Sequence, residues 1–322
     1  RVGPPKHRRR ARPNAHRHRF VSAEGGYPGP VRGEGKTMDV GGGPISVTEV
    51  RAPADRPWSG IDVVMECTGL FTDRDKAARH LQNGARSVLV SAPSKGADRT
   101  VVYGVNHDTL RPEDRIVSNA SCTTNCLAPV AKALQDTIGI ARGFMTTIHS
   151  YTGDQPTLDT AHKDLYRARA AGLNMIPTTT GAARAVGLVL PELAGRLEGT
   201  AIRVPTPNVS VVDLTFEAAR PTTAEEINAA IAAAASDGPL KGILALSTRE
   251  LVSSDFNHHP ASSIFATDQT RVMDGTMCRV LSWYDNEWGF SNRMADTAVR
   301  MGALICGTDS TGTRKAQTPE YA

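Results

Sequence analysis

Two apolar runs on either side of a polar helical segment constrain the fold more than any other feature of this sequence. Residues 61–67 (IDVVMEC) and 86–91 (RSVLVS) are short, apolar and rich in valine, which is typical of buried strands. Between them, residues 73–83 (DRDKAARHLQN) have the composition of a polar helix. Strand, helix and strand at this spacing predict a βαβ unit and therefore a parallel sheet.

A further strand is predicted over residues 115–118, directly before the segment SNASCTTNC. Apolar residues then recur at helical spacing: Leu127, Val130, Leu134 and Ile138. Pro129 lies inside this pattern, so it either kinks the helix or marks a later start. The sheet and this helix therefore meet at residues 119–122.

The second half of the chain has a different pattern. The helix expected over 223–235 begins with Thr223 and Glu226 three residues apart, which is a capping-box signature. Residues 285–304 are also helical in pattern. Strands are predicted at 143–149, 209–216 and 277–283, and an isolated one at 45–50. Strands loosely interspersed with helices predict an α+β domain with a mainly antiparallel sheet.

Length and composition exclude several classes of protein. A chain of 322 residues is long enough for about two domains. Its hydrophobic fraction of 40% contains no uncharged apolar run long enough to cross a bilayer, so we expect a soluble protein without a membrane partner. The five cysteines are sparse and odd in number, which favours free thiols and a cytoplasmic location.

The net charge of +4 comes from one basic stretch. Residues 1–19 hold eight lysines or arginines and no acid, which leaves the rest of the chain at −4. Such a stretch is typical of a disordered or non-native leader, a transit peptide or a nucleic-acid-binding arm. No aromatic residue lies among these arginines to stack on bases, so a nucleic-acid partner is not expected.

The main candidate for a catalytic residue lies where the strand 115–118 meets the helix. Cys122 is placed at the helix start, where unpaired backbone N–H groups favour a thiolate, so it is a candidate nucleophile. The alternatives are a buried structural cysteine pair with Cys126, or half of a zinc site. A C-x3-C spacing without further ligands makes a metal site unexpected. His149 ends a predicted strand, where it could act as a base or be a structural histidine.

Three segments could bind anions. They are YRARAAG with Arg167, PTTTGAA with Thr180 and Gly181, and IRVPTPNVS with Arg203. Guanidinium groups, hydroxyls and backbone N–H groups all suit phosphate. Each segment alone would also be compatible with an ordinary surface face or turn.

Taken in order, six motifs resemble phosphorylating glyceraldehyde-3-phosphate dehydrogenase. The resemblance covers about residues 45–302, and residues 20–29 fit the same family less closely. Six ordered motifs of this length are a specific signal. They are SNASCTTNC, IHSYTGDQ, HKDLYRARAA, NMIPTTTGAA, IRVPTPNVSVVDL and WYDNEWGFSNRM.

The resemblance implies an α/β fold with two domains. A doubly wound nucleotide-binding domain would comprise residues 1–121 and 286–322, and an α+β catalytic domain residues 122–285. It also implies a homotetramer and a glycolytic or gluconeogenic reaction. In that reaction glyceraldehyde 3-phosphate and inorganic phosphate give 1,3-bisphosphoglycerate through a cysteine thioester, with hydride transfer to NAD.

The resemblance assigns roles to individual residues. Cys122 would be the nucleophile and His149 the base. NAD is the implied cofactor, and NADP stays open because the residue that reads the ribose is not identified. Substrate and phosphate would be bound by Thr152 and Arg203 and by Ser121, Thr123, Arg167, Thr180 and Gly181, and the cofactor by Thr68, Gly69, Ser91 and Asn286.

Two positions depart from the family. Phe290 stands where many members carry a tyrosine, which keeps the ring and loses a hydroxyl. More severely, no strand, Gly-rich turn and helix of the dinucleotide-binding type opens the sequence. A coding segment read out of frame would have the composition of residues 1–19. We therefore expect the family pattern to be lost upstream of residue 20 and the strand beginning at Ile61 to be an exposed sheet edge.

Two other functions stay open at this point. A cofactor-deficient relative would keep a reactive thiol with little dehydrogenase activity. A relative acting on erythrose 4-phosphate is the enzymatic alternative, although Tyr151 and Thr152 after His149 resemble the triose enzyme more.

Overall fold

The computed structural model describes residue 23 and residues 25–307, in two compact units divided after Trp58. The expectations for residues 1–19 lie outside the described residues. In the first unit, β1 (Arg32–Glu34), β2 (Thr37–Asp39) and β3 (Pro44–Ser46) form an antiparallel meander. The strand expected over 45–50 was therefore too long at its end, because β3 stops at Ser46.

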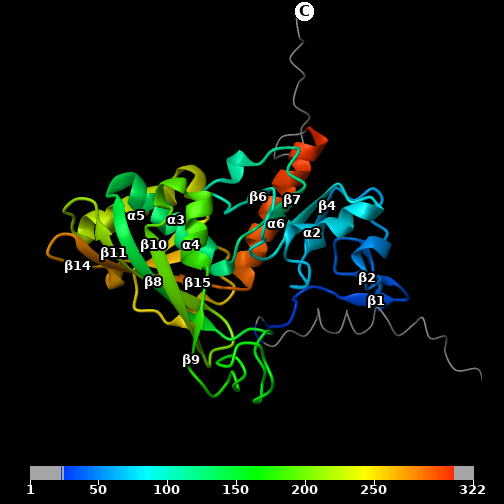
Figure 1. Ribbon diagram of the computed structural model, residues 1–322, viewed down its shortest axis with the longest axis horizontal. Coiled ribbons are helices and arrows are strands. Elements are labelled where there is room, and N and C mark those ends of the chain that lie inside the picture. Colours follow the sequence, from blue (N-terminus) through cyan, green and yellow to red (C-terminus); the bar gives the residue numbers. More distant parts are fainter. Residues whose placement is uncertain (1–22, 24, 308–322) are drawn as a thin grey trace, which may run out of the picture. The chain divides into compact units, whose positions relative to one another are not determined.

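The second unit contains a four-stranded parallel sheet, as the βαβ pattern predicts (Figure 1). Its strands, in spatial order, are β4 (Val63–Glu66), β5 (Ser87–Val90), β7 (Ile116–Ser118) and β6 (Arg99–Thr100). The polar connection is α2 (Arg74–Ala77) continued by a 3-10 helix (Ala78–Asn83), with Asp73 capping the start by accepting a hydrogen bond from Lys76 N–H.

β4 is an edge strand among the described residues, as the sequence predicts. It pairs with β5 on one side, and Met65 in its middle is 49% exposed. The two central strands, β5 and β7, are mostly apolar and buried. They therefore provide most of the buried apolar surface by which this sheet stabilises the fold.

The last helix, α6 (Trp288–Cys306), packs against the same four-stranded sheet (Figure 1). Met294 and Met301 on the helix join Leu89 and Val117 in one buried cluster, against which Phe290 also packs. Phe290 thus contributes hydrophobic surface at the position where many family members carry a tyrosine. The helix predicted over 285–304 is confirmed with a start three residues later.

The larger sheet has eight strands, with five antiparallel and two parallel pairings. The α+β prediction with a mainly antiparallel sheet is therefore confirmed. Along its main path the order is β12 (Leu244–Ser247), β13 (Ser263–Ala266), β15 (Met277–Tyr284), β11 (Ser210–Ala218), β8 (Ile140–Ser150), β10 (Leu197–Val204) and β9 (Ile176–Thr179), and β14 (Arg271–Met273) pairs with β15.

Three helices lie against this sheet: α3 (Cys122–Thr137), α4 (Ala182–Val189) and α5 (Ala224–Ser236) (Figure 1). α3 starts at Cys122 and continues through Pro129, so the later start is excluded. Thr223 caps α5 by accepting from Glu226 N–H, but the Glu226 carboxylate binds Arg220 and Thr222. Only half of the predicted capping box is thus formed.

Short 3-10 helices connect several elements, namely Pro53–Asp55, His107–Thr109, Pro191–Leu193, Gly238–Leu240, Ser253–Phe256 and Thr267–Gln269. Among residues 23 and 25–307, no helix has the length and hydrophobicity that crossing a bilayer requires.

Candidate functional site

The chain makes a tight turn between β7 and α3. Ala120 adopts a left-handed conformation with φ of 56°, although it is not a glycine. The Asn125 side-chain amide donates to the carbonyls of Asn119 (2.8 Å) and Ser121 (3.0 Å), and Ser121 Oγ accepts from Thr124 N–H (3.1 Å). These contacts hold the turn and leave Cys122 as the first residue of the helix.

His149, at the end of β8, lies beside this cysteine. Its Nε2 is 3.4 Å from Cys122 Sγ, and its Nδ1 is 2.7 Å from the Ser150 carbonyl oxygen. Nδ1 also lies 3.1 Å from Arg203 Nη1, which only donates, but the shorter contact is with the carbonyl, which only accepts, and this favours a proton on Nδ1. In that tautomer the unprotonated Nε2 faces the thiol, in the arrangement of a base next to its nucleophile.

Burial changes the charge state expected for this pair. Burial raises the pKa of the Cys122 thiol, against the lowering by the Arg203 charge and by hydrogen bonds with Thr123. Burial and the Arg203 charge together lower the pKa of His149 to about 3. A neutral imidazole therefore faces the sulfur. The helix end favours a thiolate at Cys122, which is what the sequence predicts, and the desolvation of sulfur opposes it.

Arg203 reaches the same place from β10. β8 and β10 are parallel, and their register sets Arg203 opposite His149. Its Nη1 donates to Ser150 O (2.9 Å) and lies 3.4 Å from Thr152 Oγ1. Its Nε is buried without a hydrogen-bond partner in the described structure. An unsatisfied buried guanidinium N–H is costly, and an anion beside it would satisfy it.

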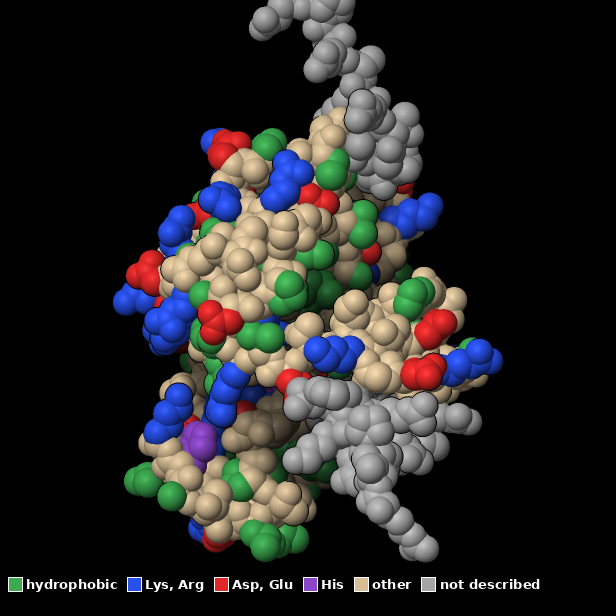
Figure 2. All heavy atoms as spheres, turned by 90° about the vertical axis from the view of Figure 1, so that its right-hand side faces the viewer, with side chains coloured by type: hydrophobic (Ala, Val, Ile, Leu, Met, Phe, Trp, Pro, Cys, Tyr) green, Lys and Arg blue, Asp and Glu red, His purple; other side chains and the backbone are tan. Residues whose placement is uncertain are grey.

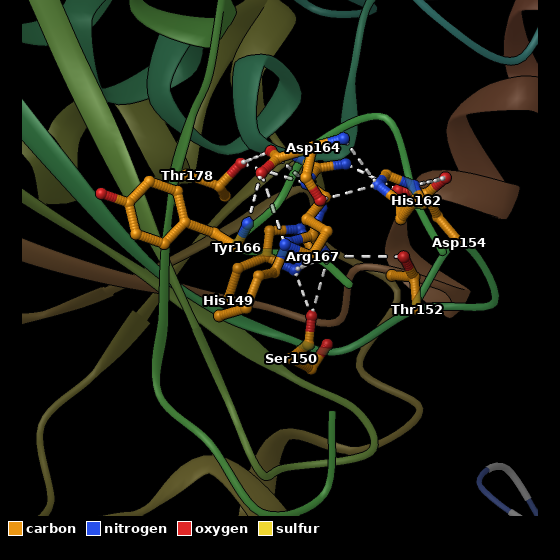
Figure 3. Close-up of polar contacts among 10 residues, drawn as sticks. His149, Ser150, Thr152, Asp154, His162, Asp164, Tyr166, Arg167 and Thr178 are labelled. Atoms are coloured by element: carbon orange, nitrogen blue, oxygen red, sulfur yellow. Dashed lines mark hydrogen bonds and ion pairs between the residues drawn. The ribbon is translucent and has the colours of Figure 1, made fainter. Parts of the chain in front are cut away.

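Arg167 is held very differently. Its Nη1 donates to Asp154 (2.7 Å) and its Nε to Thr178 Oγ1 (3.0 Å), while Asp164 lies 3.6 Å from Nε. Figure 3 shows these side chains around Arg167, with His162 on the side of Asp154. The two carboxylates compensate its charge, so an anion that binds Arg167 has to compete with them.

The other predicted phosphate ligands lie at two helix starts that the fold brings together. Thr124 Oγ1 donates to Ala182 O (3.3 Å), which links the first turns of α3 and α4. Three hydroxyls are already engaged: Ser121 Oγ contacts Thr124, Thr123 Oγ1 contacts Tyr284 OH (2.8 Å), and Thr180 Oγ1 accepts from Ala182 N–H (3.2 Å). A Cβ at Gly181 would meet nothing within 4 Å, so the backbone there is open.

The predicted cofactor residues follow strand ends or precede α6. Ser91 follows β5, and the Thr68 N–H donates to Glu66 Oε1 (2.8 Å) at the end of β4. Thr68 Oγ1 also donates to this oxygen. Gly69 is left-handed (φ 73°), and a Cβ there would meet nothing within 4 Å. Asn286 lies next to the Cys122–His149 pair through its contact with Ser150. Open backbone and an amide beside the thiol fit the nicotinamide end of a dinucleotide.

Several residues of the site escaped the sequence-based prediction. They are Asp154 and Asp164 on Arg167, Ser150 and Ser210 on Asn286, and the buried His80, whose Nε2 is 2.7 Å from Glu66 Oε2. Asp154 is part of the motif IHSYTGDQ and could have been considered on that ground. Asp164, three residues before Arg167, and Ser150 also lie in quoted motifs, whereas Ser210 and His80 have partners that are more distant in sequence.

Cys126, one turn along α3, is a chemical contrast to Cys122. It is fully buried, its Sγ contacts Ser263 Oγ (3.4 Å), and burial raises its pKa to about 12. It therefore stays a thiol. The combination of a parallel sheet, an antiparallel sheet and a cysteine–histidine pair where they meet defines a thiol-dependent α/β protein of the nucleotide-binding class.

Comparison with known proteins narrows this class. Residues 121–286 match the family model described as "Glyceraldehyde 3-phosphate dehydrogenase, C-terminal domain", and residues 8–74 match "Glyceraldehyde 3-phosphate dehydrogenase, NAD binding domain". The chain belongs to the glyceraldehyde-3-phosphate dehydrogenase family. The second match begins inside the basic stretch, so it does not support the interpretation of residues 8–19 as foreign to the family.

Individual relatives agree with the family models. The chain is 71% identical to a glyceraldehyde-3-phosphate dehydrogenase of Cereibacter sphaeroides over 292 residues, which is 91% of this chain and 87% of the relative. It is 69% identical to that of Xanthobacter flavus (90% and 87% covered) and 54% identical to that of Geobacillus stearothermophilus (88% and 86% covered).

Proposed function

We propose that this protein is a phosphorylating glyceraldehyde-3-phosphate dehydrogenase that uses NAD. The observation that carries the proposal is the 3.4 Å contact between Cys122 Sγ and the unprotonated Nε2 of His149. A thiol with an adjacent base, next to a half-buried arginine whose buried Nε has no partner among the described residues, suits covalent chemistry on a phosphorylated aldehyde.

The proton movements follow from this geometry. Nε2 of His149 takes the thiol proton as Sγ bonds to the aldehyde carbon, and it returns this proton to the former carbonyl oxygen, which gives a thiohemiacetal. Nε2 then accepts the hydroxyl proton when the hydride leaves, and a thioester remains on Cys122. Phosphate oxygen attacks the thioester and the C–S bond breaks, which releases the acyl phosphate, and the leaving sulfur takes the proton back from Nε2 to restore the thiol. NAD, when bound, supplies the acceptor for the hydride.

Two anion subsites would serve this sequence of steps. Arg203 with Thr152 would hold the phosphate of the aldehyde, and Arg167 with Ser121, Thr123, Thr180 and Gly181 would hold the attacking phosphate. The convergent starts of α3 and α4 support this assignment, because backbone N–H groups at helix starts attract anions. Thr68, Gly69, Ser91 and Asn286 would bind NAD.

The domain boundaries remain part of the proposal. Residues 1–121 with 286–322 would bind the cofactor, and residues 122–285 would carry the chemistry. The packing of α6 on the four-stranded sheet supports this division, because it returns the end of the chain to the sheet that precedes Cys122. A preference for NAD over NADP and a cytoplasmic location are proposed on the sequence alone.

A homotetramer is proposed on an exposed apolar surface. The loop between β8 and β9 exposes Leu158 (74%), Leu165 (83%), Leu173 (81%) and Met175 (76%). Figure 1 shows this loop at the bottom of the view. Figure 2, which is turned about the vertical axis, shows hydrophobic side chains at the same height. Such a surface favours association between subunits. Light scattering coupled to size exclusion tests it, and a monomer at micromolar concentration would contradict it.

The activity is tested with the three substrates in purified protein. We expect NADH formation that requires both glyceraldehyde 3-phosphate and inorganic phosphate. Cys122→Ser should abolish it, and His149→Asn should reduce it by about 100- to 10,000-fold, the usual contribution of a general base. Cys306→Ser, which changes an exposed thiol at the end of α6, is the control. NADH formation independent of phosphate would refute the phosphorylating assignment.

Within residues 25–307 β4 pairs with a strand on one side, β5, and this favours a second candidate, a thiol protein with weak cofactor binding. In a doubly wound sheet the dinucleotide site lies at central strands. Calorimetric titration with NAD separates the two: the second candidate requires weak or no NAD binding together with normal alkylation of Cys122.

A further inference from the structure

The side-chain oxygen of Asn286 accepts two hydroxyl hydrogen bonds. Ser150 Oγ and Ser210 Oγ each lie 2.8 Å from Oδ1, and the Ser150 N–H donates to Ser210 Oγ (3.0 Å). All three residues are buried. Each serine has one hydroxyl proton and both protons go to the same oxygen, so both of its lone pairs are used.

This arrangement selects one of the two orientations of the amide. If the amide were turned over, Nδ2 would donate to both serines, and Ser210 Oγ would accept from Nδ2 and from the Ser150 N–H at once. The serine protons would then need other acceptors, and the two hydroxyl oxygens are 3.3 Å apart. The observed orientation satisfies all of these groups and is therefore favoured.

The Asn286 nitrogen is left available to a ligand. Among the contacts of the described residues Nδ2 has no hydrogen-bond partner, and it is not one of the buried atoms that lack one. Asn286 contacts Ser150, which follows His149 directly in β8, so the amide lies one strand position away from the Cys122–His149 pair. The position thus presents a donor.

The backbone around the amide is held as firmly as the amide itself. Asp285 accepts from the N–H groups of Glu287 (3.0 Å) and Trp288 (2.8 Å) and from the Asn208 side chain (3.0 Å). Between Asn208 and Ser210, Val209 is left-handed (φ 65°), which is strained for a β-branched residue. Strain of this kind persists only where neighbouring contacts impose it, and here both neighbours contact residues 285–286.

We propose that Ser150 and Ser210 are positioning residues that fix Asn286 as a hydrogen-bond donor to the carboxamide oxygen of the nicotinamide. The inference rests on the proposed function, because it requires that Asn286 faces the cofactor. Neither serine needs to touch the cofactor. Their effect is to keep the amide nitrogen, and not the oxygen, directed to it.

The test is calorimetric binding of three ligands. NAD has the carboxamide, 3-acetylpyridine adenine dinucleotide keeps the carbonyl oxygen but lacks the NH2, and ADP-ribose lacks the nicotinamide. For the wild type we expect both dinucleotides to bind with Kd values within about twofold, and more tightly than ADP-ribose. For Ser210→Ala and Ser150→Ala we expect the preference for NAD over ADP-ribose to fall by about fivefold, with ADP-ribose unchanged.

Three further variants make the test specific. Ser210→Thr keeps the hydroxyl and should restore the preference. Asn286→Asp, which presents only acceptor oxygens, should lose it without depending on the serines. Ser87→Ala removes a buried hydroxyl that donates to Asp62 O in the parallel sheet, and it should change nothing.

Each outcome decides between the proposals. A wild type that prefers NAD to ADP-ribose, with serine variants that keep this preference, would overturn the inference and leave the proposed function standing. Much weaker binding of the acetyl analogue than of NAD would show that Asn286 presents its oxygen, and would also overturn it. A wild type that binds neither NAD nor ADP-ribose would overturn the proposed function and the inference together.

Discussion

The surroundings of Arg203 and Arg167 differ although the sequence assigns both to anion binding. Arg203 contacts a carbonyl, a hydroxyl and the His149 ring, and its Nε is buried without a partner among the described residues. Arg167 is compensated by the carboxylates of Asp154 and Asp164. An anion at Arg203 therefore pairs with a positive charge that no carboxylate in the described contacts neutralises. An anion at Arg167 has to displace a carboxylate that already neutralises the guanidinium.

The largest expected effect is that of Arg203→Ala. We expect the KM for glyceraldehyde 3-phosphate to rise about 100-fold, or about 3 kcal/mol, because a desolvated charge contact is lost. The KM for inorganic phosphate should change much less. Arg169→Ala is a matched control, since Arg169 is an exposed arginine paired with Asp159. Equal effects of the two variants would remove the distinction between Arg203 and an ordinary surface arginine.

The second effect concerns acid stability. The pKa of His149 is about 3 in the folded protein, below its usual value, so below pH 6.5 the unfolded chain binds a proton that the folded protein does not. Stability from this group is therefore lost as the pH falls from about 6.5 towards 3. From pH 7 to pH 5 we expect the unfolding free energy to fall by about 2 kcal/mol more in the wild type than in His149→Asn.

The acid-dependent loss of stability should also differ between variants of Arg203 and of Arg167. Both lower the pKa of His149, and Arg203 contributes more than Arg167. Near pH 4, Arg203→Ala should therefore reduce the acid loss more than Arg167→Ala does. Urea denaturation at each pH measures it, and a larger change in Arg167→Ala would reverse the ranking.

Third in size is Arg167→Ala. We expect the KM for inorganic phosphate to rise about tenfold, or about 1.4 kcal/mol, with the KM for the aldehyde nearly unchanged. The effect is smaller than for Arg203 because the bound phosphate replaces contacts with Asp154. Steady-state kinetics with each substrate varied separately distinguishes the two subsites. Parallel shifts in both KM values would mean that the arginines serve one common subsite.

The smallest effect, and one of opposite sign, is expected for Asp154→Asn. Loss of the competing carboxylate should lower the KM for phosphate about two- to threefold, since Asp154 is half exposed and its ion pair is weak. Initial rates at limiting phosphate measure the change. An increase in KM would show that Asp154 orients Arg167 instead of competing with the anion.

The parts of the fold that were predicted correctly have local signals. The strands around 61–67 and 86–91 and the helix capped by Thr223 are visible in short windows of sequence. The two-residue strand β6 is too short to show periodicity, and it forms because β7 lies beside it. The sequence therefore predicts which layers form more reliably than which short strands complete them.

The residues of the site also differ in whether a short segment of sequence predicts them. Cys122, His149 and Arg203 lie in motifs that resemble one family, and the structure brings them together. The carboxylates that compensate Arg167 are near it in sequence, but the loop that brings them to it has no periodic pattern. The two hydroxyls on Asn286 depend on contacts between distant segments; Ser210 and Asn286 are 76 positions apart. The raised pKa of Cys122 is missed for the same reason, because desolvation depends on packing that no short segment specifies.

The left-handed Ala120 limits how this turn can vary in sequence. The residue is 1% exposed, so a larger side chain has no room, and its φ of 56° disfavours any residue with a branched Cβ. Glycine adopts a positive φ without strain and needs no extra room, although it loses more conformational entropy on folding than alanine, which makes it the one well-tolerated replacement. A library randomised at this codon and selected for activity should therefore return alanine and glycine almost exclusively, even though the side chain at position 120 takes no part in the chemistry.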